Sequence, residues 1–170
     1  MRKGLAVHSD AAQPFNHAER RLSSALAQRF GVTMLKTGAA HAPVDAVWVR
    51  NGECVGCSEH KVRQISREEI KAMGDTYLIT EQKLFDGIQL GSLLGVPFYI
   101  AALLLPDNTA YIWKVIDDHG VQQFSWSAAL TTTQDTCEGG TATRVNAYLP
   151  MAHATAIPVG SIHAYLNQIK

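Results

Sequence analysis

The chain has 170 residues, of which 46% are apolar and 18% are charged, a balance typical of a single globular domain with a proper buried core. Fifteen basic and fifteen acidic residues give a formal net charge of zero, so overall basicity provides no argument for nucleic-acid binding. Three cysteines do not predict a disulfide framework, and the apolar runs are too short for a signal peptide or a membrane span, so we expect a cytoplasmic protein without a membrane partner.

The first predicted element is a helix from Asn16 to Phe30, which follows a lead-in over residues 1–15 and stops at Gly31. Its apolar residues recur at helical spacing and form one stripe: Leu22, Ala25, Leu26 and Phe30. Glu19 lies along that stripe, and two interpretations of it stay open. It is either a carboxylate directed toward a metal ion or the acidic partner in a capping box that begins at Asn16.

A strand over Val32–Lys36 and a loop of small residues lead to a β-hairpin that spans Asp45 to Lys61. Asn51-Gly52 lies between two strand-like runs and predicts the turn of this hairpin. On the second strand Glu59 and Lys61 share one face, because successive side chains of a strand point to opposite faces.

The loop of the hairpin decides whether Asp45 joins these two residues. With a two-residue loop, Asp45 pairs with Ser58 and faces away from Glu59. With a three-residue loop in which Gly52 forms a bulge, or with a bulge at Gly56, Asp45 shares a face with Glu59. The two residues are then diagonal neighbours roughly 7–8 Å apart at the backbone, close enough for their carboxylates to hold one ion. Both loop types fit the sequence, and the convergence is a prediction.

The chemistry of such a site follows from its residue types. Two carboxylates on adjacent strands offer the hard oxygen ligands that Mg²⁺ prefers, and Mn²⁺ is expected to substitute for it. A bound ion of this kind polarises a phosphoryl oxygen and lowers the pKa of a bound water molecule. Lys61 on the same face is suited to stabilising charge on a phosphate or to orienting the attacking water.

The cysteines suggest a competing metal site. Cys54 and Cys57 have the spacing of half a zinc site, which His60 and Cys137 would complete. On a regular strand, however, Cys54 and Cys57 point to opposite faces, which favours buried free thiols. His60 points away from Glu59, and core packing is the favoured role for its side chain.

After the hairpin we expect a short helix, a link and a longer helix. Ser66 opens a capping box for the short helix. Tyr77–Ile79 is predicted to be a short extended or irregular link. The longer helix runs from Glu81 to Leu94, where Gly87 and Gly91 indicate a close approach to the sheet.

The apolar run Val96–Leu105 predicts a central strand that is covered on both faces, and Tyr111–Ile116 predicts a further strand. Residues 117–170 are expected to form a C-terminal extension that packs on the same domain. Within it we expect an exposed loop, a strand and a terminal helix or turn, over Thr131–Gly140, Val145–Leu149 and Ser161–Gln168 respectively.

Asp45, the turn and Glu59-His60-Lys61 resemble the motif of the PD-(D/E)xK nuclease superfamily, although Pro43 stands two residues before Asp45 rather than directly before it. The resemblance covers residues 16–116. It implies a restriction-endonuclease-like α/β fold with an αβββαβ core, in which helices flank a mixed central sheet. It further implies that Asp45 and Glu59 bind a divalent metal ion and that Lys61 assists hydrolysis. Glu19 matches the further acidic residue that this superfamily often carries on the preceding helix.

The chain is also similar to a group of phage and bacterial nuclease-like proteins. The shared elements are Glu59-His-Lys61, Tyr77-Leu-Ile-Thr80, Lys83 and Gly95-Val-Pro-Phe98. This similarity implies that Lys83 faces the catalytic site, and a solvated surface lysine is the alternative. It also implies a host cytoplasm, bacterial or phage-infected, with duplex or branched DNA as the partner. For residues 117–170 three roles stay open: covering the sheet edge, forming the contact of a homodimer, or shaping the substrate groove.

Three functions remain open from the sequence. The first is a metal-dependent deoxyribonuclease. The second is a catalytically inactive protein of the same fold that binds nucleic acid or a protein partner, as a phage or defence component. The third is an unrelated small α/β binding protein in which Glu59 and Lys61 form a surface pair. Added metal should raise the melting temperature of a protein with a genuine carboxylate site, which the third function does not predict.

Overall fold

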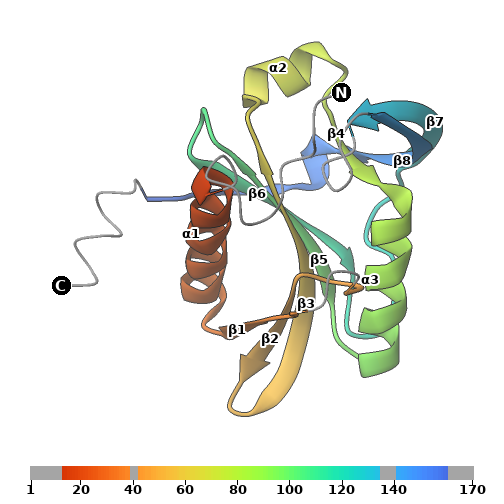
Figure 1. The fold of residues 1–170 in the computed structure, drawn as a ribbon. Helices are drawn as coiled ribbons and strands as arrows, with labels where there is room; N and C mark the ends of the chain where they lie inside the picture. The colour runs from red at the N-terminus through yellow and green to blue at the C-terminus, as the bar shows by residue number, and fades with distance from the viewer. Residues whose placement is uncertain (1–12, 39–41, 135–140, 161–170) are drawn as a thin grey trace.

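The computed structural model describes residues 13–38, 42–134 and 141–160 (Figure 1). The three α-helices in these residues are α1 (Gln13–Phe30), α2 (Arg67–Ala72) and α3 (Glu81–Leu94). The strands are β1 (Thr33–Lys36), β2 (Ala46–Arg50), β3 (Glu53–Arg63), β4 (Thr76–Thr80), β5 (Phe98–Leu104), β6 (Thr109–Ile116), β7 (Ser127–Gln134), β8 (Thr141–Pro150) and β9 (Thr155–Pro158). A short 3₁₀ helix, η1 (Met151–His153), separates the last two strands. None of the helices in the described part of the chain is long and apolar enough to cross a membrane.

The main sheet has six strands in the order β1-β2-β3-β5-β6-β9. It is a mixed sheet, because β3 and β5 run parallel while its other neighbouring strands are antiparallel. The chain order α1-β1-β2-β3-α3-β5 is the expected αβββαβ core, with α2 and β4 inserted between β3 and α3. The restriction-endonuclease-like α/β fold predicted from the sequence is therefore confirmed.

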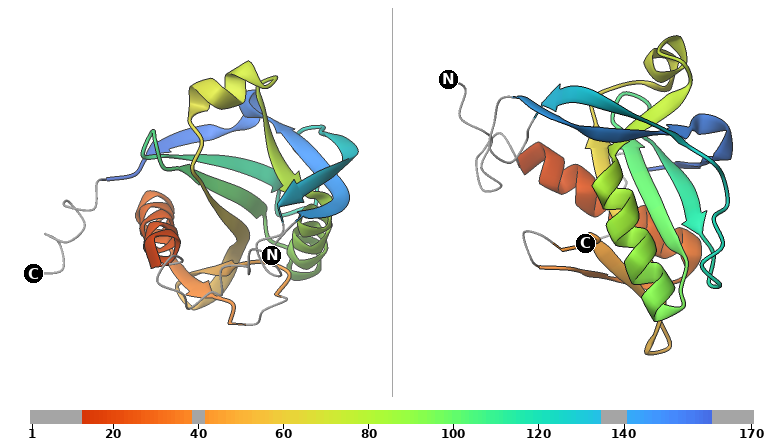
Figure 2. Two further views of the ribbon diagram at one scale, coloured as in Figure 1. Left: turned by 45° about the horizontal axis from the view of Figure 1, so that its top comes forward. Right: turned by 90° about the vertical axis from the view of Figure 1, so that its right-hand side faces the viewer.

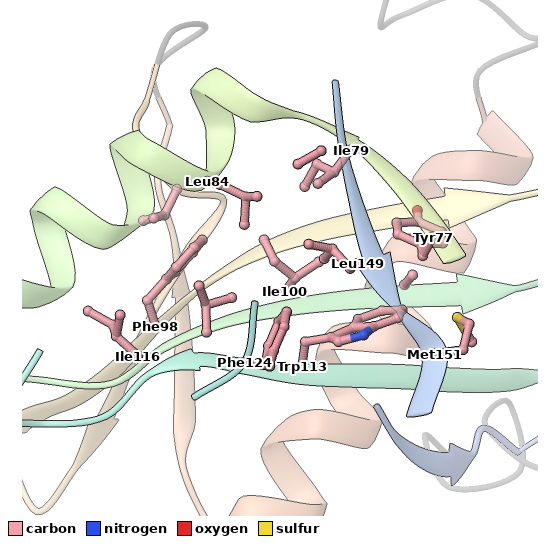
Figure 3. Close-up of a cluster of buried hydrophobic side chains, with 14 of the residues drawn as sticks. Tyr77, Ile79, Leu84, Phe98, Ile100, Trp113, Ile116, Phe124, Leu149 and Met151 are labelled. Carbon is pink, nitrogen blue, oxygen red and sulfur yellow. The ribbon is translucent and has the colours of Figure 1, made fainter. Parts of the chain in front are cut away.

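Helices cover the two faces of this sheet, with α1 on one side and α3 on the other (Figure 1). On the α1 face, Leu22 and Leu26 of the helix pack with alternate residues of the central strands, such as Leu103. On the α3 face, Leu84 packs with Phe98 in the larger cluster of buried side chains, which we call the cluster under α3 (Figure 3). Strand β5 lies between the two clusters and is almost wholly buried, as expected for the apolar run Val96–Leu105.

Two glycines allow α3 to approach the sheet closely. A Cβ atom added at Gly87 would lie 2.1 Å from the ring of Phe98, and one at Gly91 would lie 2.9 Å from the carbonyl oxygen of Val96. Both glycines are buried. The spacing of the two glycines predicted this contact, and Gly95 ends the helix in the left-handed conformation that favours glycine (φ 64°).

A second sheet has the order β4-β8-β7, and two of its strands, β4 and β7, include segments that the sequence predicts to be a short extended or irregular link and a loop. Residues 76–80, which include the expected link, form β4 and pair with β8, far along the chain. Thr131–Gln134, expected to lie in a loop, belong to β7, while residues 135–140 lie outside the described residues. The expected strand Val145–Leu149 is the inner part of β8, and the segment 161–168 also lies outside the described residues. Figure 2 shows the strands of both sheets, and Figure 3 shows that Ile79 and Leu149 of the second sheet join Ile100 of the main sheet in one buried cluster.

The β2–β3 hairpin combines a two-residue loop with a bulge, two features that the sequence offers separately. Its loop is the two-residue type: Arg50 pairs with Glu53, and Asn51 and Gly52 both have positive φ values (52° and 84°). A bulge then shifts the register, because Val49 pairs with Cys54 whereas Trp48 pairs with Gly56. The three-residue loop is therefore wrong. The bulge beside Gly56 has the same effect on the pairing, because it places Asp45 on the face of Glu59.

Candidate active site

Glu59, on β3, is the most deeply buried of the predicted site residues, with no exposed side-chain surface. Its strand partner on β5 is Ile100, which belongs to the cluster under α3, so Glu59 faces α3. Lys61, two residues further along β3, shares that face and donates a short hydrogen bond to Oε1 of Glu59. About a quarter of the Lys61 side chain remains exposed (24%), so this ion pair connects the buried carboxylate with the surface.

Asp45, the residue directly before β2, lies in the same region. The register of β2 with β3 pairs Ala46 with Ser58, so its continuation brings Asp45 beside Glu59. The backbone N–H of His60 donates to Oδ2 of Asp45 over 2.7 Å, which fixes the position of this carboxylate. Asp45 also contributes to raising the pKa of Glu59, as expected for two nearby negative charges.

The protonation of Glu59 reflects opposing effects. Burial is the largest and raises the pKa of its carboxyl group above the ordinary value of 4.5. Lys61 lowers this pKa by its charge and its hydrogen bond, Asp45 raises it, and Lys83 lowers it. The effect of burial is larger than that of the two lysines, so the positive charge around Glu59 does not fully compensate its ionised carboxylate.

Lys83, in the first turns of α3, comes close to the site. Its Nζ atom lies 3.7 Å from Oε2 of Glu59 and donates a hydrogen bond of 3.0 Å to the carbonyl oxygen of Ala42. The ammonium group therefore links the segment before Asp45 to α3. One third of the Lys83 side chain is exposed (33%). Lys83 therefore both approaches Glu59 and contacts solvent, so each of the two sequence-based expectations describes part of its environment.

Glu19 lies elsewhere. Its carboxylate pairs with Lys36 over 3.0 Å, and its helix α1 covers the face of the sheet opposite to α3. Among the residues that the structure describes, no three His, Cys, Asp or Glu side chains are grouped so that they could hold a metal ion. The capping-box interpretation of Glu19 is wrong, because α1 begins at Gln13 and Asn16 lies inside the helix.

Behind the carboxylates, His60 anchors β3 to α1. Its ring is buried and lies 2.8 Å from the Ser58 hydroxyl through Nε2 and 3.3 Å from the Ser23 hydroxyl through Nδ1. The Trp48 indole N–H donates to the same Ser58 hydroxyl over 2.8 Å. Burial lowers the pKa of His60 to about 4, Asp45 raises it, and the neighbouring lysines lower it, so the ring is neutral at pH 7.

This polar network was not foreseen from the sequence, although the alternation of Ser58 and His60 on one face was a usable signal. The network matters to the site because the backbone N–H of the anchored His60 holds Asp45. The side chain of His60 points away from Glu59, as expected from the alternation along β3.

The alternative zinc site receives no support from the described residues. Cys54 is exposed whereas Cys57 is buried, and Cys137 lies outside the described residues. Burial raises the pKa of Cys57 to about 12, with a further contribution from Cys54, so Cys57 is a thiol rather than a thiolate ligand.

Glu59 and Asp45 have the donor chemistry that a divalent cation requires. Oε2 of Glu59 is buried and has no hydrogen-bond partner, an unusual state for a carboxylate oxygen. A cation between the two acidic groups would satisfy this oxygen and offset the repulsion that raises the pKa of Glu59. Oxygen ligands of this kind fit Mg²⁺ or Mn²⁺.

Comparison with known proteins adds independent information. A family model described as "Phage putative PDDEXK endonuclease" matches residues 10–125, a range that includes Asp45, Glu59 and Lys61. A search of curated proteins gave no match. Among solved structures, Archaeoglobus fulgidus Hjc, a Holliday junction resolvase from an archaeal hyperthermophile, is similar with 14% sequence identity and a TM-score of 0.41. That similarity covers 59% of this chain and 74% of the resolvase chain.

Proposed function

Because this chain belongs to the phage PDDEXK endonuclease family, a branch of the PD-(D/E)xK nucleases, we propose that it hydrolyses DNA phosphodiester bonds with the help of a divalent metal ion. The observation that carries the proposal is the buried Glu59 carboxylate. One of its oxygens has no hydrogen-bond partner, Asp45 lies close enough to influence its pKa, and two lysines approach it.

In this proposal Asp45 and Glu59 hold the metal ion, with Mg²⁺ as the expected cofactor and Mn²⁺ as its substitute. The bound ion supplies Lewis-acid activation of the phosphodiester and lowers the pKa of the attacking water. The hydrogen bond from the His60 backbone leaves the second carboxylate oxygen of Asp45 for this role while restricting its rotation.

Lys61 is the residue through which the site contacts the scissile phosphate. Its ammonium group is oriented by Glu59 and partly exposed, so it is positioned to stabilise the negative charge that develops on phosphate oxygens during hydrolysis. Lys83 acts more indirectly. Its bond to Ala42 holds the segment that leads to Asp45 against α3, and its charge partly compensates Glu59.

The experiment compares cleavage of linear duplex, branched and single-stranded DNA by the wild-type chain and by two variants, Asp45→Asn and Lys61→Ala, in Mg²⁺ and Mn²⁺. Both variants should lose at least about a hundredfold in rate. Lys114→Ala is the matched control, because Lys114 is an exposed lysine on β6 whose partner Tyr99 packs on the α1 face. If both variants cleave as the control does, the assignment of the site fails.

A thermal-shift measurement tests the metal site separately from cleavage. Mg²⁺ or Mn²⁺ should raise the melting temperature of the wild-type chain but not that of Asp45→Asn, because an ion that binds only the folded state stabilises it. Equal shifts in both chains would mean that the ion binds elsewhere.

A further inference from the structure

Strand β3 carries a third charged residue on the face of the proposed catalytic pair. Glu59, Lys61 and Arg63 alternate along the strand, and their partners on β5 are Ile100, Ala102 and Leu104, which all belong to the cluster under α3. The row begins at a fully buried carboxylate and ends at a half-buried guanidinium group. Both positive charges therefore lie on the same side of Glu59 along β3, where the side chains of the row become partly exposed.

We propose that Arg63 binds a phosphate of the nucleic-acid backbone next to the one positioned by Lys61. The inference rests on the proposed function and adds a substrate-binding residue to it. Arg63 does not contact the reacting atoms in this arrangement. It sets which phosphate of the nucleic-acid strand lies beside Glu59.

Most N–H donors of the Arg63 side chain have no partner among the described residues. Among the described residues, the only hydrogen bond of its side chain runs from Nη1 to the carbonyl oxygen of Val62, at 3.3 Å, and no ion pair to it is found there. A guanidinium group has five N–H donors in a fork that matches phosphate oxygens. Lys61, in contrast, already donates one hydrogen bond to Glu59, and Lys83 donates one to the carbonyl oxygen of Ala42.

The spacing of Lys61 and Arg63 along β3 also fits a nucleic-acid backbone. Residues two apart on a strand are separated by about 6.8 Å. Consecutive phosphates along a nucleic-acid strand have a similar separation. A strand that places one phosphate at Lys61 can therefore place the next at Arg63 without distortion of either partner.

Two buried aromatic side chains lie near the row. Tyr77, on β4, is buried against Trp113 with ring centroids 5.2 Å apart, and burial raises its pKa to about 12. The charge of Arg63 lowers this pKa and that of Glu59 raises it, so both lie near the tyrosine. Trp113 lies on β6 opposite Ile100, so this buried aromatic pair is on the same side of the main sheet as the row, where the scarcity of water strengthens the attraction between a cation and a phosphate.

The test uses a duplex oligonucleotide cleaved under single-turnover and steady-state conditions by the wild-type chain, Arg63→Ala and Arg63→Lys. We expect Arg63→Ala to raise KM about tenfold while kcat stays within about twofold, because a lost charge-assisted contact to a flanking phosphate weakens binding alone. Arg63→Lys should recover part of the loss, since it keeps the charge but not the fork. Arg29→Ala is the matched control, an exposed arginine in the last turn of α1.

Salt dependence provides the readout that a merely structural role would not change. Binding of the same oligonucleotide to Asp45→Asn is followed by fluorescence anisotropy at several salt concentrations, with and without Arg63→Ala. The added substitution should reduce the slope of log affinity against log salt by about one, the value expected for one lost phosphate contact. Arg29→Ala in the same background should leave the slope unchanged.

The outcomes separate the two proposals. If the wild-type chain cleaves DNA and Arg63→Ala matches Arg29→Ala in KM and in salt slope, the phosphate contact is refuted and the nuclease assignment stands. If the wild-type chain neither cleaves nor binds DNA with either metal, both proposals fall. If Arg63→Ala lowers the melting temperature and kcat together, Arg63 acts through the fold and the phosphate contact is again refuted.

Discussion

Gly87 controls the approach of α3 to the sheet, and Gly87→Ala is the substitution that tests the packing most directly. The added Cβ atom would lie 2.1, 2.3 and 2.4 Å from three ring atoms of Phe98, far inside van der Waals contact. The ring has no exposed surface and is enclosed by the cluster under α3, so it cannot move into solvent.

The expected magnitude follows from two opposing effects. Displacing the Phe98 ring from its place is comparable with losing it from the core, which costs about 3–5 kcal/mol. Alanine at position 87 favours the helix by about 1 kcal/mol relative to glycine. The net loss should be about 2–4 kcal/mol, which corresponds to a fall in melting temperature of about 5–15 °C for a chain of this size. Cleavage should fall as well, because α3 carries Lys83 to Glu59.

Chemical denaturation and differential scanning fluorimetry measure this loss. Gly38→Ala is the matched control, because a Cβ atom at Gly38 meets nothing within 4 Å. The double variant Gly87→Ala/Phe98→Leu should recover part of the stability by making room for the new methyl group. A Gly87→Ala chain as stable as the Gly38→Ala chain would refute the close packing of α3 on the sheet.

Three further predictions concern the charged groups. Glu59→Gln should abolish cleavage yet raise the melting temperature of the metal-free chain at pH 7. Burial raises the pKa of Glu59, so the folded chain loses stability as the pH rises above 4.5 and the buried carboxyl group ionises. A lower melting temperature of the variant would show that Lys61 and Lys83 outweigh burial. The pKa of His60 is lowered from 6.5 to about 4, so its stabilisation is present above pH 6.5 and is lost as the pH falls toward 4, by up to roughly 3 kcal/mol. Urea denaturation in EDTA at pH 7 and pH 5 should show roughly half of this loss, because pH 5 still lies above the lowered pKa, and His60→Gln should remove it. Lys83→Ala should slow cleavage by about tenfold, less than Lys61→Ala does, because Lys83 approaches Glu59 only to 3.7 Å; single-turnover rates with Mg²⁺ compare the two variants.

Local patterns predicted much of this protein. The turn at Asn51-Gly52, the capping box at Ser66 and the common face of Glu59 and Lys61 depend on residues close together in the chain, and each is present in the structure. The buried strand at Val96–Leu105 was equally readable, because an apolar run of that length is typical of a strand covered on both faces.

Pairings between distant segments were not readable in this way. Residues 76–80 look like a short link until β8 supplies a partner for their backbone about seventy positions later. The side of the sheet that each helix covers also decided the fate of two charged residues. It brought Lys83 to Glu59 and left Glu19 with Lys36.

The sequence by itself determined the helix–strand order of the core and the Glu59–Lys61 pair, because hydrophobic period and alternation are properties of neighbouring residues. Only the tertiary structure decided that Asp45 joins them. A single bulged residue in β3 reverses the face of everything that follows it, and the sequence allowed the strand to be regular or bulged. The physical reason is that the free energy of such a bulge depends on what the shifted side chains meet across the fold, and those neighbours come from other parts of the chain.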